Sequence, residues 1–82
     1  MKTNSKKVII ITGASSGIGK ETARKLIEEG HIVYGAARRV DQMKDLLKAG
    51  GYTLELDVTD ENQIITSVKQ VLDAQGRIDV FN

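Results

Sequence analysis

The sequence contains no cysteine and no proline, and it has a single histidine. The absence of cysteine excludes disulfides, thiolate metal sites and cysteine nucleophiles for these residues. His31 cannot build a metal site alone, so we expect it to have a structural or solvated role. The sequence therefore predicts no metal centre.

Long apolar runs are also missing. The longest, Val8–Ile11, has four residues, whereas a membrane-spanning helix needs about 20. The polar segment Met1–Lys7 is predicted to fray, and no apolar stretch long enough for a signal peptide follows it. We therefore expect a cytoplasmic protein without membrane association.

The chain has little net charge. Its 12 basic and 11 acidic residues give +1 at neutral pH, which provides no strong electrostatic case for binding nucleic acid or a membrane surface. A length of 82 residues, with 40% hydrophobic and 28% charged residues, fits one small folded domain.

A glycine-rich loop follows the apolar run. Gly13, Gly17 and Gly19 separate Val8–Ile11 from a segment of helical character, Ile18–Glu29. Three glycines alone also fit a tight turn, but a strand before the loop and a helix after it are the context of a phosphate site. A helix N-terminus has free N–H donors and partial positive charge, and glycine lets a ligand approach the backbone. The segment therefore predicts an anion-binding loop.

The rest of the sequence repeats this alternation. Further strands are predicted over residues 31–36, 52–56 and 77–81, and helices over 18–29, around 43–47 and after residue 60. Such alternation predicts an α/β fold, a partial Rossmann-type parallel sheet with helices on both faces. Right-handed crossovers give strand order 3-2-1-4. The order reverses between strands one and four, beside the glycine loop, where ligands of such sheets bind.

Local signals predict where the helices begin and end. Asp41 is predicted to cap the short helix, and Asp60 and Gln63 have the spacing of a capping box. Gly30 and Gly76 suit left-handed helix ends. The last helix carries an apolar stripe predicted to pack on the sheet: Ile64, Ile65, Val68, Val71 and Leu72. The third strand alternates in polarity, which favours a position at the edge of the sheet.

The segment Thr12–Gly19, T-G-A-S-S-G-I-G, strongly resembles the cofactor loop of the short-chain dehydrogenase/reductase family. The segments Leu56–Val58 and Gly76–Val80 are similar to two further motifs of that family. The resemblance implies that residues 1–82 form one N-terminal dinucleotide-binding, half-Rossmann segment. The C-terminal catalytic half of the family is absent from this sequence.

The resemblance also implies which residues bind the cofactor. The implied set comprises Gly13, Ser15, Ser16, Gly17, Ile18, Gly19, Arg38, Arg39, Asp57 and Val58. Ser15 and Ser16 match loop positions used for phosphate or ribose contacts, although they would also suit a plain turn. Asp57 matches an aspartate that contacts the adenine amino group, and it would equally suit a turn leading into a helix.

The end of the second strand bears on the choice of cofactor. Sites that bind NAD carry an acidic residue there, whereas an arginine suits the 2′-phosphate of NADP. In this chain Ala37 occupies the position of the acid, and Arg38 and Arg39 follow. Two solvated surface arginines are the alternative, but the glycine loop favours phosphate recognition. We therefore expect NADP(H) to be preferred over NAD(H).

The family's catalytic motifs have no counterpart in this sequence. The N-N-A-G segment, the serine and the Tyr-x-x-x-Lys pair are missing, and neither Tyr34 nor Tyr52 has a lysine four residues later. The resemblance thus implies the cofactor-binding part of an oxidoreductase acting on an alcohol or carbonyl substrate, inactive alone and with no readable substrate. The alternatives are a non-catalytic nucleotide-binding or regulatory module and a scaffold without a ligand.

The fourth predicted strand indicates how the chain could associate with other polypeptides. Ending the sheet there would leave an apolar edge, and such edges pair with other chains. We therefore expect self-association through this edge or pairing with the missing C-terminal half.

Overall fold

A computed structural model describes residues 6–82. The fraying predicted for the N-terminus concerns mostly residues 1–5, which lie outside the described residues. The strands are β1 (Val8–Thr12), β2 (Ile32–Ala37), β3 (Tyr52–Glu55) and β4 (Val80–Phe81). The helices are α1 (Gly17–Glu28), the 3₁₀ helix η1 (Val40–Met43), α2 (Lys44–Lys48) and α3 (Glu61–Gln75).

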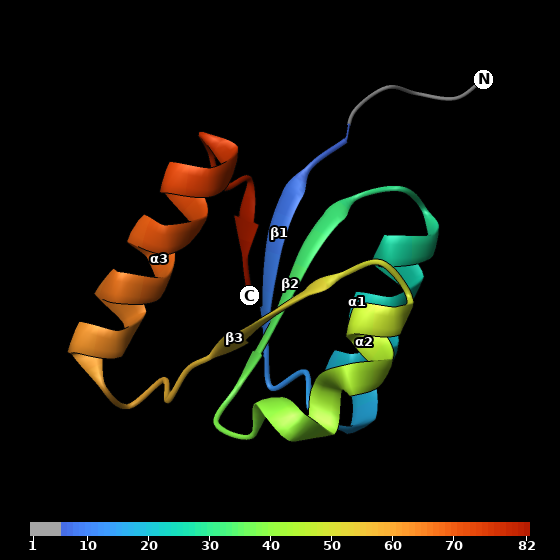
Figure 1. Cartoon of the computed structure of the whole chain (residues 1–82), viewed down its shortest axis with the longest axis horizontal. Coiled ribbons are helices and arrows are strands. Elements are labelled where there is room, and N and C mark those ends of the chain that lie inside the picture. Colours follow the sequence, from blue (N-terminus) through green and yellow to red (C-terminus); the bar gives the residue numbers. More distant parts are fainter. Residues whose placement is uncertain (1–5) are drawn as a thin grey trace.

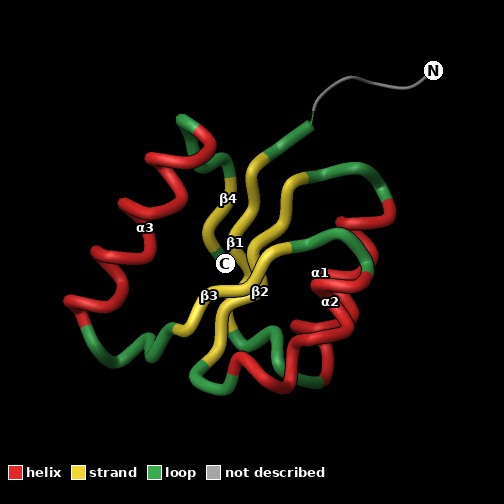
Figure 2. The backbone as a smooth tube through the Cα atoms, in the orientation of Figure 1, coloured by secondary structure: helices red, strands yellow, loops and turns green. Residues whose placement is uncertain are grey.

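The four strands form one parallel sheet in the order β3-β2-β1-β4. Helices α1 and α2 cover one face of the sheet and α3 covers the other (Figures 1 and 2). The predicted fold class, strand order and edge position of β3 are confirmed. All four strands point the same way, so their carboxyl ends gather at one end of the sheet.

The central strand β1 explains the continuous apolar run in the sequence. Its residues alternate between two buried clusters, with Ile9 and Ile11 facing the α1–α2 side and Val8 and Ile10 facing the α3 side. All four are almost inaccessible to solvent. A strand covered on both faces cannot alternate with polar residues, and β1 therefore has apolar residues throughout.

The helices on the first face approach the sheet closely at Gly35 in β2. A Cβ at this position would lie 2.7 Å from Cδ1 of Leu46 and 3.3 Å from the sulfur of Met43. Both side chains are fully buried. Because glycine has no side chain, Gly35 leaves the space that Met43 of η1 and Leu46 of α2 occupy.

The edge strand β3 is held partly by an aromatic pair. Tyr52 stacks on Tyr34 of β2, with 4.7 Å between the ring centroids. Tyr34 is buried and its hydroxyl accepts a hydrogen bond from Nε2 of Gln75 in α3. Neither tyrosine lies in the glycine loop, which agrees with the prediction that both are structural.

Two local predictions require correction, and a third is confirmed. Asp41 does not cap a helix, because it lies inside η1, whose N-cap Arg39 forms no side-chain hydrogen bond. β4 begins at Val80 and not at residue 77, because Arg77 turns to bond the Lys6 carbonyl and Asp79. The helix ends predicted at Gly30 and Gly76 are confirmed, since both glycines have positive φ.

The apolar stripe of α3 packs on the sheet only in part. Val71 is fully buried and Ile64 is half-buried against the same cluster. Ile65 and Leu72 remain 62% and 42% exposed, which contradicts the prediction for these two residues. In residues 6–82 no strand lies beyond β4 to extend the sheet under this flank of the helix.

The capping box at the start of α3 is confirmed in one of its two bonds. The Asp60 carboxylate accepts hydrogen bonds from the amides of Asn62 and Gln63. The Gln63 side chain does not return to the Asp60 amide. Its Oε1 accepts from the amide of Asp57 at 2.8 Å, which ties α3 to the loop after β3.

Asp79 joins β4 to the start of β1. Its Oδ2 accepts hydrogen bonds from the Val8 amide at 2.8 Å and from Nε of Arg77 at 2.9 Å. The bond from Val8, with the charge and bond of Arg77, holds the pKa of Asp79 below its usual value, although partial desolvation opposes this. A carboxylate with a lowered pKa stabilises the fold in its ionised form.

We predict that Asp79→Asn lowers the thermal unfolding midpoint at pH 7. The difference from the wild type should shrink as the pH falls below about 4, where the wild-type aspartate also loses its charge. Unfolding followed by circular dichroism at both pH values measures this. Asp73→Asn, an exposed site on α3, is the matched control. Equal midpoints at pH 7, or a gap that persists unchanged in acid, would contradict the assignment.

Candidate functional site

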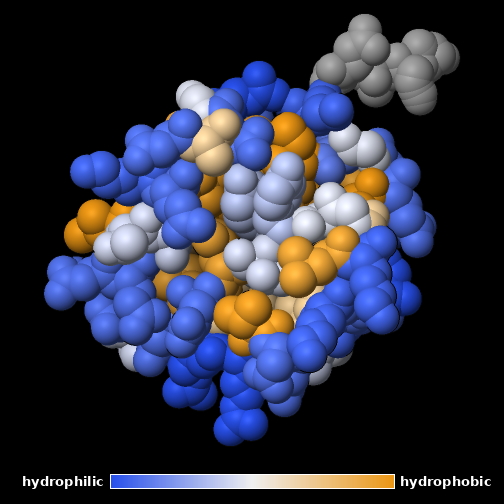
Figure 3. Space-filling view, viewed as in Figure 1, coloured by the Kyte–Doolittle hydropathy of each residue, from blue (hydrophilic) through white to orange (hydrophobic). Residues whose placement is uncertain are grey.

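A hollow of about 300 Å³ lies at the carboxyl ends of β1 and β2. The amide of Ala14 donates a hydrogen bond to the carbonyl of Ala36 and so ties the glycine loop to the end of β2. The lining residues come from the end of β2 and from the loops after β1, β2 and β3: Gly13, Ser15, Ala36, Ala37, Arg38, Leu56, Asp57, Val58 and Thr59. Figure 3 shows apolar residues reaching the surface between α3 and the helices opposite, with hydrophilic residues around them.

The glycine loop and α1 are in unusually close contact. A Cβ on Gly19 would lie 2.4 Å from the carbonyl oxygen of Gly13 and 2.9 Å from its carbonyl carbon. No side chain fits between these backbone segments. Gly13 and Gly17 in addition adopt positive φ. The turn from β1 into α1 is therefore as tight as the sequence pattern predicts.

The N-terminus of α1 lacks an internal cap. Its N-cap Ser16 makes no side-chain capping bond, and the first turn carries no acidic residue. The start of α3 differs, since the Asp60 carboxylate accepts from two amides there. Uncapped N–H donors and the helix dipole both favour an external anion. The first turn of α1 thus has the chemistry of a phosphate-binding helix start.

A second hollow of about 260 Å³ adjoins the first. Ser15, Arg38, Arg39 and Gln42 line it, and Ser15 and Arg38 line both hollows. Arg38 therefore stands between the two spaces, next to the glycine loop. A guanidinium presents several donors in a planar fork that matches a phosphate group.

The loop after β3 forms the opposite wall of the first hollow. Oδ1 of Asp57 accepts hydrogen bonds from the hydroxyl of Thr59 at 2.6 Å and from its amide at 2.9 Å. These bonds hold the pKa of Asp57 below its usual value, with a further contribution from the charge of Arg38. Asp57 is therefore a turn residue leading into α3, and it also lines the hollow. Val58 is 56% exposed beside it.

A cluster of charged residues connects α1 with η1 and α2. Nζ of Lys20 donates to the carbonyl of Gln42 at 2.9 Å and lies 3.3 Å from Oδ2 of Asp45. Nη2 of Arg24 donates to the same carboxylate oxygen at 3.0 Å. Partial desolvation would raise the pKa of Asp45, but the bonds and charges of Lys20 and Arg24 outweigh it and hold the pKa below its usual value.

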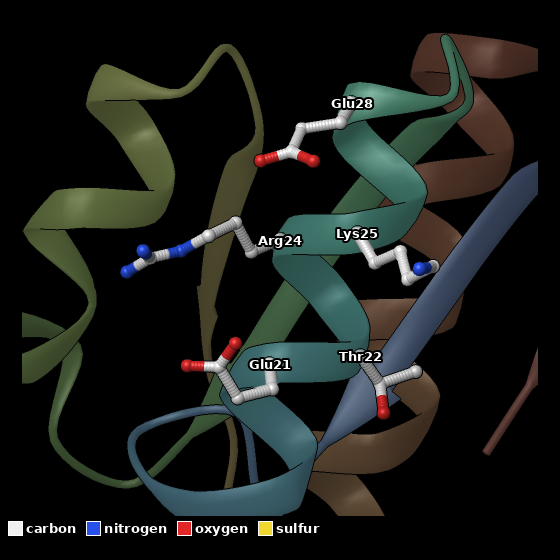
Figure 4. Close-up of a pocket in the computed structure, with 5 residues that line it drawn as sticks. All are labelled: Glu21, Thr22, Arg24, Lys25 and Glu28. Atoms are coloured by element: carbon white, nitrogen blue, oxygen red, sulfur yellow. The ribbon is translucent and has the colours of Figure 1, made fainter.

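A shallow hollow of about 360 Å³ on α1 has a different character. Its residues all come from one helix, and Figure 4 shows the five side chains spread over the outer surface of α1: Glu21, Thr22, Arg24, Lys25 and Glu28. Two carboxylates flank two cations along the helix. Such a face is typical of an amphipathic helix exposed to water, and it lies apart from the glycine loop.

The structure brings most of the sequence-predicted residues together. Gly13, Ser15, Arg38, Asp57 and Val58 line the first hollow, and Arg39 lines the second. Ser16 occupies the N-cap position of α1 without forming a capping bond, and the first turn contains Gly17, Ile18 and Gly19. Ile18 is 86% exposed and lines neither hollow.

Sequence reasoning missed Thr59 and Gln42. Thr59 follows Asp57 at the spacing of an Asx turn, a signal that could have identified its bonds. Gln42 was missed because the sequence predicted only a short helix capped by Asp41, and nothing local distinguishes Gln42 from a surface residue. In residues 6–82 no cluster of three metal-ligating side chains is present, and no helix there has the length and apolar character needed to cross a membrane.

Comparison with known proteins places this site in a family. The family model for the short chain dehydrogenase matches residues 7–82. The chain is 43% identical over 75 residues to a 3-ketodihydrosphingosine reductase of Bacteroides thetaiotaomicron, which covers 92% of this chain and 26% of that protein.

Solved structures agree. A short-chain dehydrogenase from Streptomyces avermitilis superposes with a TM-score of 0.90 at 38% identity, over 98% of this chain and 30% of that one. A metagenomic short-chain oxidoreductase in complex with NADP gives 0.83 at 34% identity, over 92% and 37%. The chain thus spans about a quarter to somewhat over a third of these proteins.

The matched residues include the strand, glycine loop and helix that build the site, together with the loops that line both hollows. This chain belongs to the short chain dehydrogenase family.

Proposed function

We propose that this chain is the NADP(H)-binding portion of a short-chain dehydrogenase/reductase that transfers hydride between the nicotinamide and an alcohol or carbonyl substrate. One observation carries the proposal. Arg38 and Ser15 line both hollows, so a guanidinium stands beside the glycine loop at the strand end where an acid would favour NAD. The structural neighbour crystallised with NADP supports the same cofactor.

In this proposal the pyrophosphate binds at the start of α1. Gly17, Ile18 and Gly19 supply amides that are not capped by Ser16, and Ser15 and Ser16 supply hydroxyls. The contact between Gly19 and Gly13 keeps the loop close to the start of α1, so that a diphosphate can reach the backbone. These residues fit a diphosphate because they supply N–H and O–H donors, which its oxygen atoms can accept.

The adenosine occupies the first hollow in this proposal. Leu56, Asp57 and Val58 offer one buried apolar side chain, a carboxylate and an exposed apolar side chain on its wall. Only Oδ1 of Asp57 is taken up by Thr59, and Oδ2 can accept a hydrogen bond from the adenine amino group. The 2′-phosphate lies toward Arg38 and Arg39, at the second hollow.

A bound nicotinamide would exchange hydride with the substrate, and in this proposal the proton donor and the substrate contacts come from residues other than those that line the two hollows. The titratable groups that line the two hollows are Arg38, Arg39 and Asp57. Arg38 and Arg39 carry guanidinium groups, which serve as hydrogen-bond donors, and the pKa of Asp57 is lowered. None of these three groups has the properties of a general acid near neutral pH. We accordingly assign this chain to cofactor binding and not to catalysis.

We predict that Arg38→Asp reverses the cofactor preference. The substitution removes a charged hydrogen-bond partner and adds a repulsive charge, so the affinity for NADPH should fall about tenfold or more. The affinity for NADH should stay constant or rise. Isothermal titration of the chain with each cofactor measures the ratio, and Lys69→Leu on α3 controls for the loss of a surface cation. An unchanged ratio would refute the role of Arg38.

We predict that Gly19→Ala weakens NADPH and NADH equally and strongly. The new Cβ would force the Gly13 carbonyl away and lift the loop from the helix start. Lys25→Ala on the same helix is the control, because it changes an exposed side chain outside the loop. Circular dichroism establishes that the variant is folded. If the folded Gly19→Ala variant bound both cofactors with unaltered affinity, the pyrophosphate would not bind at this loop.

The free edge of β4 is proposed as a site of self-association. Within residues 6–82, β4 pairs only with β1, and its residues Val80 and Phe81 are about two-fifths exposed. Exposed apolar edges recruit further strands, and another copy of the chain can supply one.

We predict a sedimentation coefficient that rises with concentration for the wild type and less for Phe81→Lys. Leu47→Lys, which replaces a half-exposed apolar side chain on α2, is the control. A monomer at every concentration would contradict self-association and would leave pairing with a separate C-terminal polypeptide to be tested by co-sedimentation.

A further inference from the structure

The charged cluster between α1 and η1–α2 joins the two halves of the proposed cofactor site. Lys20 lies one residue after Gly19, on the helix proposed to hold the pyrophosphate. Its partners are the Gln42 carbonyl at 2.9 Å and the Asp45 carboxylate at 3.3 Å. Gln42 lies in η1, which begins directly after Arg39. The cluster thus fixes the distance between the phosphate loop and the arginine segment.

Lys20 is engaged away from the hollows. Its ammonium group is directed to the Gln42 carbonyl and to Asp45, and it lines neither hollow. The segment that it holds does line the second hollow, through Arg38, Arg39 and Gln42. A lysine beside a glycine loop would ordinarily suggest a phosphate ligand, but here the Lys20 ammonium group pairs with the Asp45 carboxylate.

We propose that Lys20 and Asp45 are positioning residues for 2′-phosphate recognition, which hold the Arg38–Gln42 segment against α1 without touching the cofactor. The inference rests on the proposed preference for NADP(H). It adds a determinant of specificity that acts through Arg38 and Arg39, from a part of the fold outside the two hollows.

The fold does not depend on this cluster. Met43 and Leu46 are fully buried and anchor η1 and α2 in the core. The side chains of Lys20 and Asp45 are 23% and 39% exposed, and ion pairs of such exposure contribute little to stability. A small displacement of a ligand-binding group can nevertheless reduce its effect greatly. Loss of the cluster should therefore change selectivity more than stability.

The test compares two probes that differ only in the 2′-phosphate, 2′,5′-ADP and 5′-AMP. Each is titrated calorimetrically into the whole chain carrying Lys20→Met or Asp45→Asn. We expect each variant to bind 2′,5′-ADP about five- to tenfold more weakly, well below the roughly hundredfold that a full misplacement can cost. Binding of 5′-AMP should remain unchanged, as should the unfolding midpoint. Lys20→Arg should restore binding, because it keeps the charge and the donors.

Two comparisons make the result decisive. Lys25→Met removes the same charge from the outer face of α1 and should leave both probes unaffected (Figure 4). If Asp45→Asn strengthens 2′,5′-ADP binding, the released Lys20 is a direct phosphate ligand and the positioning role is overturned. If both probes weaken in parallel, the cluster only supports the fold, which also overturns it.

Arg38→Asp in the same assay separates this inference from the proposed function. If Arg38→Asp weakens 2′,5′-ADP binding more than 5′-AMP binding while Lys20→Met and Asp45→Asn do not, the positioning role fails and the NADP(H) preference stands. If Arg38→Asp changes the binding of both probes equally, the preference fails and the positioning role fails with it.

Discussion

The contact between Gly13 and Gly19 is the constraint on which the site depends. With 2.4 Å between the Gly13 carbonyl oxygen and a hypothetical Cβ on Gly19, only glycine allows β1 to turn directly into α1. The turn places the uncapped first amides of the helix at the carboxyl end of the central strand. A longer or looser connection would separate the helix start from the hollow beside it.

The surrounding fold keeps this turn in place from several sides. β1 is buried on both faces and paired along both edges, with β2 and with β4. The bond from Ala14 to Ala36 ties the loop to the end of β2, from which Arg38 follows. The bond from the Asp57 amide to Gln63 fixes the third loop to α3. Parallel strands thus bring three separate loops to one end of the sheet.

The sequence predicted those parts of the molecule whose signals are local. The apolar run of β1, the glycine loop and the Asp60 cap each lie within a few residues, and they led to the correct fold class and strand order. Asp41 was misassigned because several polar residues near a short helix could equally cap it. The exposure of Ile65 and Leu72 depends on what lies beside α3, which helical periodicity cannot reveal.

The connections across the site were beyond sequence reasoning for a similar reason. Lys20 and Asp45 are 25 residues apart in number and meet only because η1 and α2 dock at Gly35. The Gln63 side chain accepts from the Asp57 amide and donates to the Asp60 carboxylate, and it does not accept from the Asp60 amide, because the loop folds back onto the helix. Such contacts follow from the tertiary arrangement and leave no periodic or spacing signal.

In the proposed complex the amides at the start of α1 receive a diphosphate while Arg38 receives the 2′-phosphate. A nuclear magnetic resonance titration of the isotope-labelled chain with NADPH tests both contacts at once. We predict that the largest amide shifts fall on Ser16–Gly19 and that the Arg38 side chain responds to NADPH but not to NADH. Shifts confined to other surfaces, such as the outer face of α1, would contradict it.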